Sequence, residues 1–219
     1  MKNTLLFFIL SLSFLTVFNS CNKECQITDG TYEFHISSTL YPALDTFNIG
    51  DTITIISEFN DQIYEAKTDM KYDLSNLALP SNFKIWKISN SPTSYAAILN
   101  FNILNDSSND FYYDYYQALN AYSLKGKYDY TQSTYSLTYK IIPEDTGLFM
   151  CAHGPLSTGI TFPGKCDDME SYFHVVLNNG NDNNISMLSQ SPDEHFNTWI
   201  LEKPYDRFHS GGGYAFYVK

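Results

Sequence analysis

The sequence is poor in charge, and especially in positive charge. Only 17% of its 219 residues are Asp, Glu, Lys or Arg, and 13 basic residues stand against 24 acidic ones, which gives a formal net charge of −11. A chain this acidic repels phosphate backbones, so its composition argues against nucleic acid as a partner. Low charge combined with 16% aromatic residues also excludes a disordered chain and disfavours a coiled coil.

Long hydrophobic runs are missing as well. Leu5 to Phe18 is an apolar stretch of 14 residues, interrupted only by Ser and Thr, and it follows Lys2. A membrane-spanning helix needs about 20 apolar residues, whereas a positive start before a shorter apolar core is typical of a signal peptide. No later segment offers 18 consecutive apolar residues. We therefore expect an exported protein with no membrane-spanning helix.

The apolar stretch ends in Phe18-Asn19-Ser20-Cys21, where a small residue is followed directly by cysteine. This segment resembles the lipobox of bacterial lipoproteins in a permissive form. The resemblance implies cleavage before Cys21 and acyl chains, such as palmitate, on its sulfur and amine. Those chains would anchor the protein to a bacterial membrane, which we expect to be the outer one. The alternative is an ordinary secretory signal cut nearby, with Cys21 an incidental thiol.

If the segment is a lipobox, the expected domain organisation follows from it. Residues 1–20 would be a cleaved signal peptide, 21–29 a lipidated tether and 30–219 a single β-rich domain. Removing Lys2, the one charged residue of the first 20, would leave the mature chain slightly more acidic. No repeat and no Gly/Ser-rich or Pro-rich linker divides the remainder.

Cysteine is scarce, with four residues in the chain. An oxidising compartment outside the cytoplasm allows disulfide bonds. Cys151 and Cys166 enclose a Gly- and Pro-rich loop that can fold back, so we predict a disulfide between them, contributing about 3 kcal/mol in the chain-entropy model. The alternative partner for either cysteine is Cys25. No C-x-x-C pair is present, so the spacing gives little support to a zinc site.

Alternating apolar and polar residues predict strands along most of the chain. The pattern begins at Tyr32, Phe34 and Ile36. Further strands are expected at 52–59, 82–89, 95–103, 127–142 (with a turn near 132–133), 148–153 and 213–219. Even spacing without regularly alternating helices predicts a mainly β fold, an antiparallel β-sandwich that is immunoglobulin-like or related, with an open barrel as the alternative.

A few short helices are expected beside the strands. Ser191-Pro192-Asp193-Glu194 combines a helix N-cap, a proline at the first helical position and a capping glutamate, and Pro204 would end that helix. A second helix is predicted over 111–122, where apolar residues recur at helical spacing. The segment 167–180 fits a helix and a strand equally well.

One short segment, Asp145-Thr146-Gly147-Leu148-Phe149-Met150-Cys151, resembles the D-x-G-x-Y-x-C stretch of immunoglobulin domains. The resemblance implies a turn that leads into a strand of a sandwich. Phe149 stands where those domains have tyrosine, so the hydroxyl bond of their tyrosine corner is not expected here.

Motifs for catalysis or metal binding are not found. The five histidines form neither an H-E-x-x-H motif nor an i, i+4 pair. The glycines after His209 lack an accompanying G-x-S-x-G, and the Asn-rich segment 179–184 does not match a calcium loop. Asp167-Asp168 and Glu144-Asp145 are adjacent in sequence, which rarely brings carboxylates into one pocket. We therefore assign no catalytic residue, metal or cofactor and favour a non-enzymatic role.

Aromatic residues are the one excess, with 18 tyrosines, 16 phenylalanines and two tryptophans. The segment 111–116 holds five rings in six positions. On the predicted helix, Tyr112, Tyr113 and Tyr116 would lie on the flank or the outside. Rings with polar edges suit sugar-binding and protein-binding surfaces, so these three tyrosines are the candidate binding surface. The alternative is that these tyrosines simply occupy the faces of a tyrosine-rich sandwich and have no binding role.

Together these observations predict a lipid-anchored cell-envelope protein that acts as a binding or scaffold module for a glycan or a protein. The alternative is a hydrolase or a glycan-processing accessory enzyme whose site is assembled from residues distant in sequence. A deep pocket with convergent carboxylates would favour the enzyme, whereas a flat or grooved aromatic surface would favour binding.

Overall fold

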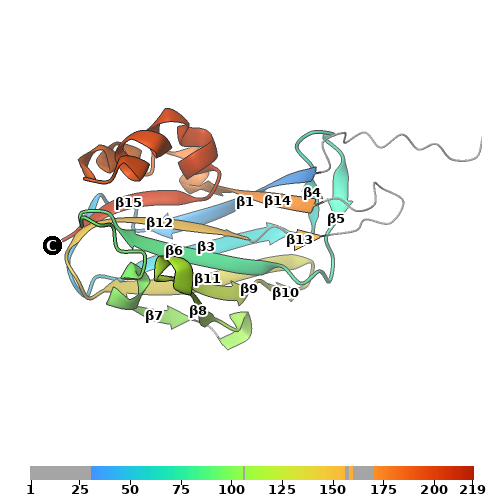
Figure 1. Ribbon diagram of the computed structural model, residues 1–219. Coiled ribbons are helices and arrows are strands. Elements are labelled where there is room, and N and C mark those ends of the chain that lie inside the picture. The colour runs from blue at the N-terminus through green and yellow to red at the C-terminus, as the bar shows by residue number, and fades with distance from the viewer. Residues whose placement is uncertain (1–30, 106, 156–157, 160–169) are drawn as a thin grey trace, which may run out of the picture.

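The computed structural model describes residues 31–105, 107–155, 158–159 and 170–219. These residues form a seven-stranded and a six-stranded sheet packed face to face, with a small two-stranded sheet at one end (Figure 1). The mainly β sandwich expected from the sequence is confirmed. No helix among the described residues is long and apolar enough to cross a bilayer.

The seven-stranded sheet runs in the order β10 (Asp129–Thr131), β11 (Thr134–Pro143), β3 (Ile53–Asn60), β1 (Thr31–Tyr41), β14 (Glu170–Leu177) and β13 (Thr158–Gly159). Strand β7 (Phe101–Asn105) pairs with the other end of β11. The pairing of β1 with β14 is parallel, and the other pairings of this sheet are antiparallel. The parallel pairing was not expected from the sequence.

The six-stranded sheet runs in the order β2 (Thr46–Phe47), β15 (Gly213–Val218), β12 (Gly147–Pro155), β6 (Pro80–Lys87), β9 (Ala121–Lys127) and β8 (Tyr112–Tyr116). Here β2 and β15 are parallel. The small sheet pairs β4 (Gln62–Tyr64) with β5 (Lys71–Asp73). Both large sheets are therefore mixed, although antiparallel pairings dominate.

The main core lies between the two large sheets, because successive residues of a strand point to opposite faces. In β1, the alternation of Tyr32, Phe34 and Ile36 places these three side chains in the core with at most 1% exposure. The six-stranded sheet contributes Phe149 and Phe216, whose rings stack with their centroids 5.8 Å apart. The core is thus largely aromatic, which accounts for much of the aromatic excess in the sequence.

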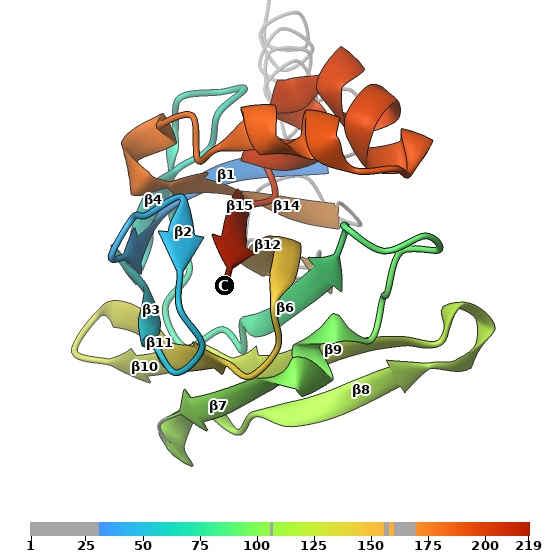
Figure 2. The same cartoon turned by 90° about the vertical axis from the view of Figure 1, so that its left-hand side faces the viewer.

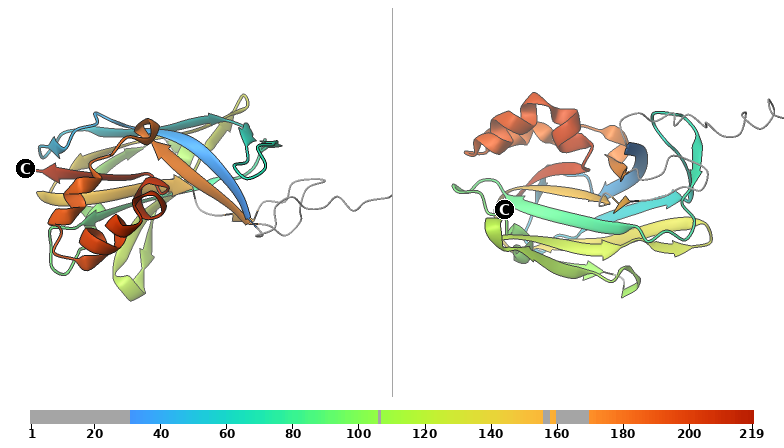
Figure 3. Two further views of the ribbon diagram at one scale, coloured as in Figure 1. Left: turned by 90° about the horizontal axis from the view of Figure 1, so that it is seen from above. Right: turned by 45° about the vertical axis from the view of Figure 1, so that its right-hand side comes forward.

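A second core lies on the outer face of the six-stranded sheet. Short helices η5 (Ile185–Gln190), η6 (His195–Ile200) and η7 (Tyr205–His209) cover this face above β12 and β15 (Figure 2). Phe196 and Phe208 from the helices pack with Leu148 and Met150 of β12. Seen from above, this helical layer covers only the side of the molecule where the C-terminus lies (Figure 3). Strands β6, β9 and β8 extend beyond it.

Most of the expected elements are present. The strands predicted at 52–59, 82–89, 148–153 and 213–219 correspond to β3, β6, β12 and β15, and 127–142 forms β10 and β11. Gln132 and Ser133 make the turn between them, with φ of 51° and 64°. The helix expected after Ser191 is η6, which ends at Ile200, before Pro204, and a separate helix, η7, begins directly after that proline. In the segment 167–180, the described part is a strand followed by η4 (Asn178–Gly180).

The predicted helix over 111–122 is wrong. This segment forms β8, the short helix η3 (Gln117–Leu119) and the start of β9, which together make a hairpin. Tyrosine favours strands. The pairing of β8 with β9 stabilises the strand, and the spacing of apolar residues within 111–122 cannot reveal that pairing. Asn120 adopts the left-handed conformation (φ 46°) that ends η3. The strand expected at 95–103 is likewise corrected, because it is divided between η1 (Ala97–Asn100) and β7.

The turn implied by the immunoglobulin resemblance leads directly into β12. The Asp145 carboxylate accepts a hydrogen bond from Lys87 Nζ at 2.6 Å, which is the main reason its pKa is lowered. Gly147 has φ of 137° and lies so close to Lys87 and Ser89 that a Cβ would approach each within 2.8 Å. Both conditions favour glycine at this position.

Candidate functional site

The tyrosines of β8 are exposed, at 58% for Tyr112, 47% for Tyr113 and 60% for Tyr116. Because β8 is a strand, its pleat divides them between two faces. Tyr112, Asp114 and Tyr116 share the outer face of the sheet, whereas Tyr113 and Tyr115 lie on the opposite face. The three candidate residues are therefore exposed without forming one surface, and their binding role stays a prediction.

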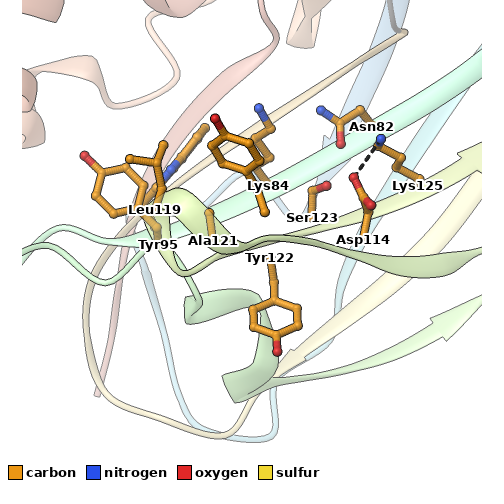
Figure 4. Close-up of a pocket in the computed structure, with 11 residues that line it drawn as sticks. Asn82, Lys84, Tyr95, Asp114, Leu119, Ala121, Tyr122, Ser123 and Lys125 are labelled. Atoms are coloured by element: carbon orange, nitrogen blue, oxygen red, sulfur yellow. Dashed lines mark ion pairs between the residues drawn. The ribbon is translucent and has the colours of Figure 1, made fainter.

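A groove of about 370 Å³ lies on the outer face of β6, β9 and β8, beside the helical layer (Figure 4). Three strands supply alternate side chains to it, and the loop before η1 closes one end with Tyr95. Its volume falls within the range of small-molecule sites. The groove is lined by Asn82, Lys84, Trp86, Tyr95, Asp114, Tyr116, Leu119, Ala121, Tyr122, Ser123 and Lys125.

Aromatic rings make up one part of the groove lining. Trp86 stands at the border of the helical layer, with its ring centroid 6.4 Å from that of Phe196. Burial, with a smaller effect from Asp193, raises the pKa of the Tyr95 hydroxyl above its ordinary value. Tyr116 completes the set from the edge strand. Trp86 thus packs against the helical layer and also lines the groove.

Polar groups occupy the other part. Asp114 and Lys125, on neighbouring strands, form an ion pair of 2.7 Å, and both project toward the same side of the sheet in Figure 4. Lys84 is exposed and has no ion-pair partner among the described residues. The buried amide oxygen of Asn82 has no hydrogen-bond partner there either. An unpaired cation and an unsatisfied amide are groups that a ligand can engage.

The reverse side of the β8–β9 hairpin is a separate tyrosine surface. Figure 4 shows Tyr122 pointing away from the other labelled groove residues. The rings of Tyr115 and Tyr122 lie 4.6 Å apart, and burial, more than Glu144, raises the pKa of Tyr113. These rings support the hairpin from behind, so Tyr113 belongs to this surface and not to the groove.

The groove has little that would perform acid–base chemistry. Asp114 is the single carboxylate in its lining, and the lining contains no histidine or cysteine. Hydrolysis of a glycosidic bond typically uses two carboxylates flanking the bond, and acyl transfer uses a nucleophile beside a base. No group of three or more metal-ligating side chains occurs among the described residues.

A series of hydrogen bonds connects four side chains in the main core. We call it the buried hydroxyl chain, and it consists of Tyr139, His153, Tyr128 and Ser57. Tyr139 Oη lies 2.8 Å from His153 Nδ1, and His153 Nε2 lies 3.5 Å from Tyr128 Oη. Tyr128 donates to Ser57 Oγ, which donates to the carbonyl of Ser37. Since each hydroxyl has one hydrogen, His153 must accept at Nδ1 and donate at Nε2.

This arrangement requires a neutral imidazole. Burial lowers the pKa of His153 from 6.5 to about 4. Cys151, two residues earlier on β12, is also buried, and burial raises the pKa of its thiol to about 12. A reactive cysteine needs a thiolate and access to solvent, and Cys151 has neither. The cysteine and histidine of β12 are therefore structural residues.

Two other histidines meet on the outer face of the seven-stranded sheet. His35 of β1 and His174 of β14 are paired in register, with ring centroids 5.2 Å apart. Glu33 Oε2 lies 3.9 Å from His174 Nε2, and a hollow of about 160 Å³ lies between His174 and His209. Burial, followed by the neighbouring His35, lowers the pKa of His174. The pair does not reach the three ligands of a typical metal site.

Two predicted covalent features fall outside the described residues. Cys21, with the lipobox, and Cys166 are not described, and neither is Cys25. Cys151 is buried, and it has no disulfide partner among the residues that the structure describes. Lipidation of Cys21 and a bond between Cys151 and Cys166 stay predictions, and peptide mapping under non-reducing conditions tests the second.

Sequence reasoning missed most of the groove. It selected three tyrosines of β8, of which Tyr116 lines the groove. Lys84 and Trp86 had a weaker signal, because the strand pattern at 82–89 places Asn82, Lys84 and Trp86 on one face. Nothing in the sequence indicated that β9 and β8 would lie beside that face.

Comparisons with known proteins give no family. No protein-family model matches the sequence, and no curated protein sequence does. Among solved structures, the chain is similar to the human F-spondin reeler domain, with a TM-score of 0.31 and 9% identity over 66% of this chain and 93% of that one. It is also similar to a serine-rich repeat adhesion glycoprotein from Streptococcus agalactiae, with a TM-score of 0.24 and 12% identity over 62% and 44%. A collagen-binding domain from a Staphylococcus aureus adhesin gives a TM-score of 0.20 and 7% identity over 64% and 96%. TM-scores this low carry no argument about what the chain binds, so its function must be argued from its own residues.

Proposed function

We propose that this protein is a lipid-anchored component of a bacterial cell envelope, in the outer membrane, whose β-sandwich binds a carbohydrate in the groove. The sequence around Cys21 supports the anchor, and the groove supports the binding role. Catalysis has less support, because the groove lining offers one carboxylate, already paired with Lys125.

The observation that carries the proposal is the mixture of groups in the groove. A sugar ring presents a face of C–H groups and an edge of hydroxyls. Trp86, Tyr95 and Tyr116 offer rings to such a face, and Asn82 and Lys84 offer polar groups to such an edge. Aromatic residues with polar tips suit surfaces that are partly apolar and partly wet. A protein ligand added to the edge of β8 is the competing possibility, because β8 ends its sheet within the described chain.

The binding test uses the mature chain with Cys21→Ser, screened on an array of bacterial and host glycans. Tyr116→Ala removes a ring of the groove, and Tyr64→Ala removes a ring of similar exposure (60% against 54%) from strand β4. We expect Tyr116→Ala to weaken binding about tenfold or more and Tyr64→Ala to leave it unchanged, since the cost of truncation concentrates in a few central residues. An array with no ligand, or equal loss in the two variants, would contradict the proposal.

The anchor has its own test. A clickable fatty acid fed to cells should label the wild type and should not label Cys21→Ser. Because acyl chains bind membranes in proportion to their buried methylenes, the variant should also leave the membrane fraction. Equal labelling of the two proteins would show that Cys21 is not the acylated residue.

A further inference from the structure

We infer that the sugar in the groove carries an anionic substituent, a carboxylate or a sulfate, which lies against Lys84. The inference rests on the proposed carbohydrate-binding function and adds the chemical class of the ligand. It follows from the unequal pairing of the two lysines in the groove lining.

The two lysines differ in what neutralises them. Lys125 Nζ lies 2.7 Å from Asp114 Oδ2, so its charge is already matched inside the groove. Lys84 has no such carboxylate among the described residues, although the chain as a whole has 24 acidic residues for 13 basic ones. Lys84 therefore gives the groove lining a positive charge that no carboxylate of the lining neutralises. Charge-assisted hydrogen bonds from such a cation to an anion are stronger than neutral ones.

The neighbours of Lys84 indicate where the rest of the ligand would lie. Asn82 and Trp86 flank Lys84 on the same face of β6, each two residues away and thus roughly 7 Å along the strand. An anionic group at Lys84 therefore places an attached ring within reach of the Trp86 indole on one side. On the other side it approaches the Asn82 amide, whose oxygen has no partner. A charged sugar fits this row better than a neutral one, which would leave the lysine unpaired.

The net charge of the chain does not prevent this. At physiological salt, charges separated by more than about 8 Å are largely screened, so the distant acidic residues repel the ligand weakly. An ion pair with Lys84 would form at contact distance, well within that screening length. Asp114 is the one acidic group in the groove lining, and it is held by Lys125. The local balance of the lining is thus one net positive charge, carried by Lys84.

Two substitutions should move affinity in opposite directions. Lys84→Gln removes the unpaired cation, and Asp114→Asn releases Lys125 from its partner and makes the groove more positive. Lys140→Gln is the matched control, because Lys140 is an exposed lysine on β11 of the other sheet. Titration calorimetry would use three oligosaccharides of equal length: an oligouronate, a sulfated oligosaccharide and a neutral one. The fold of each variant is checked by its thermal transition.

We expect the wild type to bind the oligouronate or the sulfated sugar at least tenfold more tightly than the neutral sugar. Lys84→Gln should remove about tenfold of that affinity, the size of one hydrogen bond to a charged group. Asp114→Asn should tighten binding of the anionic sugar severalfold, while Lys140→Gln changes nothing. The better of the two anionic sugars identifies the substituent.

Failure of the inference differs from failure of the proposed function. If neutral and anionic sugars bind equally and Lys84→Gln has no effect, carbohydrate binding stands and the anionic class is wrong. If no sugar binds, the proposed function fails and the inference falls with it. Binding of an acidic peptide in place of every sugar, with loss in Lys84→Gln, would also overturn the carbohydrate assignment.

Discussion

The buried hydroxyl chain and the groove use the same kind of residue in opposite ways. In the core, Tyr139 and Tyr128 each have a hydrogen-bond partner for their hydroxyls, and the chain ends on a backbone carbonyl. In the groove, Tyr116 is 60% exposed, Lys84 is unpaired and the Asn82 oxygen has no partner among the described residues. A satisfied cluster holds the fold in one arrangement, whereas an unsatisfied one is open to a ligand.

The difference between the clusters can be tested because they respond to different changes. Disturbing the buried chain should affect the free energy of unfolding, and disturbing the groove should affect binding alone.

Acid should destabilise the protein through His153. Its pKa is about 4 in the folded state and 6.5 as the ordinary value, so between these pH values the unfolded chain takes up a proton that the folded chain does not. The stabilisation is fully present above pH 6.5 and falls as pH decreases, by about 2 kcal/mol at pH 5. Chemical denaturation at pH 7 and pH 5 measures it.

The control for that experiment is a variant without the buried imidazole. In His153→Gln the pH dependence between 7 and 5 should become clearly smaller, with a remainder from His174, whose pKa burial also lowers, although the variant is less stable at both pH values. His195→Gln, which alters an exposed histidine on η6, should retain the wild-type slope. An unchanged slope in His153→Gln would show that another group responds to acid.

Removing one hydroxyl from the buried hydroxyl chain should lower the free energy of unfolding more than removing one hydroxyl from the groove. Tyr139→Phe leaves His153 Nδ1 buried without a donor, and we expect a loss of about 1–3 kcal/mol. Tyr116→Phe removes a hydroxyl that faces solvent, and its effect on stability should stay within about 0.5 kcal/mol. Denaturant midpoints of the two variants, compared with the wild type, give the answer. Similar losses of stability in the two variants would contradict the distinction between the buried hydroxyl chain and the groove.

The smallest stability change is expected for the exposed tyrosines of the outer face. Tyr112→Ser with Tyr116→Ser should leave the thermal transition almost unchanged, because both rings are more than half exposed. Adding Tyr113→Ser should lower it further, since Tyr113 lies on the reverse side of β8, where burial raises its pKa. Differential scanning calorimetry of the double and triple variants separates the two faces. A large loss in the double variant would make these rings part of the core.

The sequence was informative wherever local chemistry decides the structure. Alternation at Tyr32, Phe34 and Ile36 and the turn at Gln132 and Ser133 could be predicted because side-chain direction and turn geometry depend on a few adjacent residues. The segment 111–122 could not be predicted, because its rings fit a helix and a strand alike. Only the pairing of β8 with β9 decides between the two.

By itself the sequence determined that the chain is mainly β, acidic and rich in aromatics, and it supplied the lipobox resemblance at Cys21 and one residue of the groove lining, Tyr116. The tertiary structure decided the parallel pairing of β1 with β14, the partial cover of the six-stranded sheet by helices, and the groove beside that cover. These features join segments far apart in sequence, such as Trp86 and Lys125 in the groove and β1 and β14 in the seven-stranded sheet. Strand order and register depend on contacts between distant residues, and such contacts leave no periodic trace in any one segment.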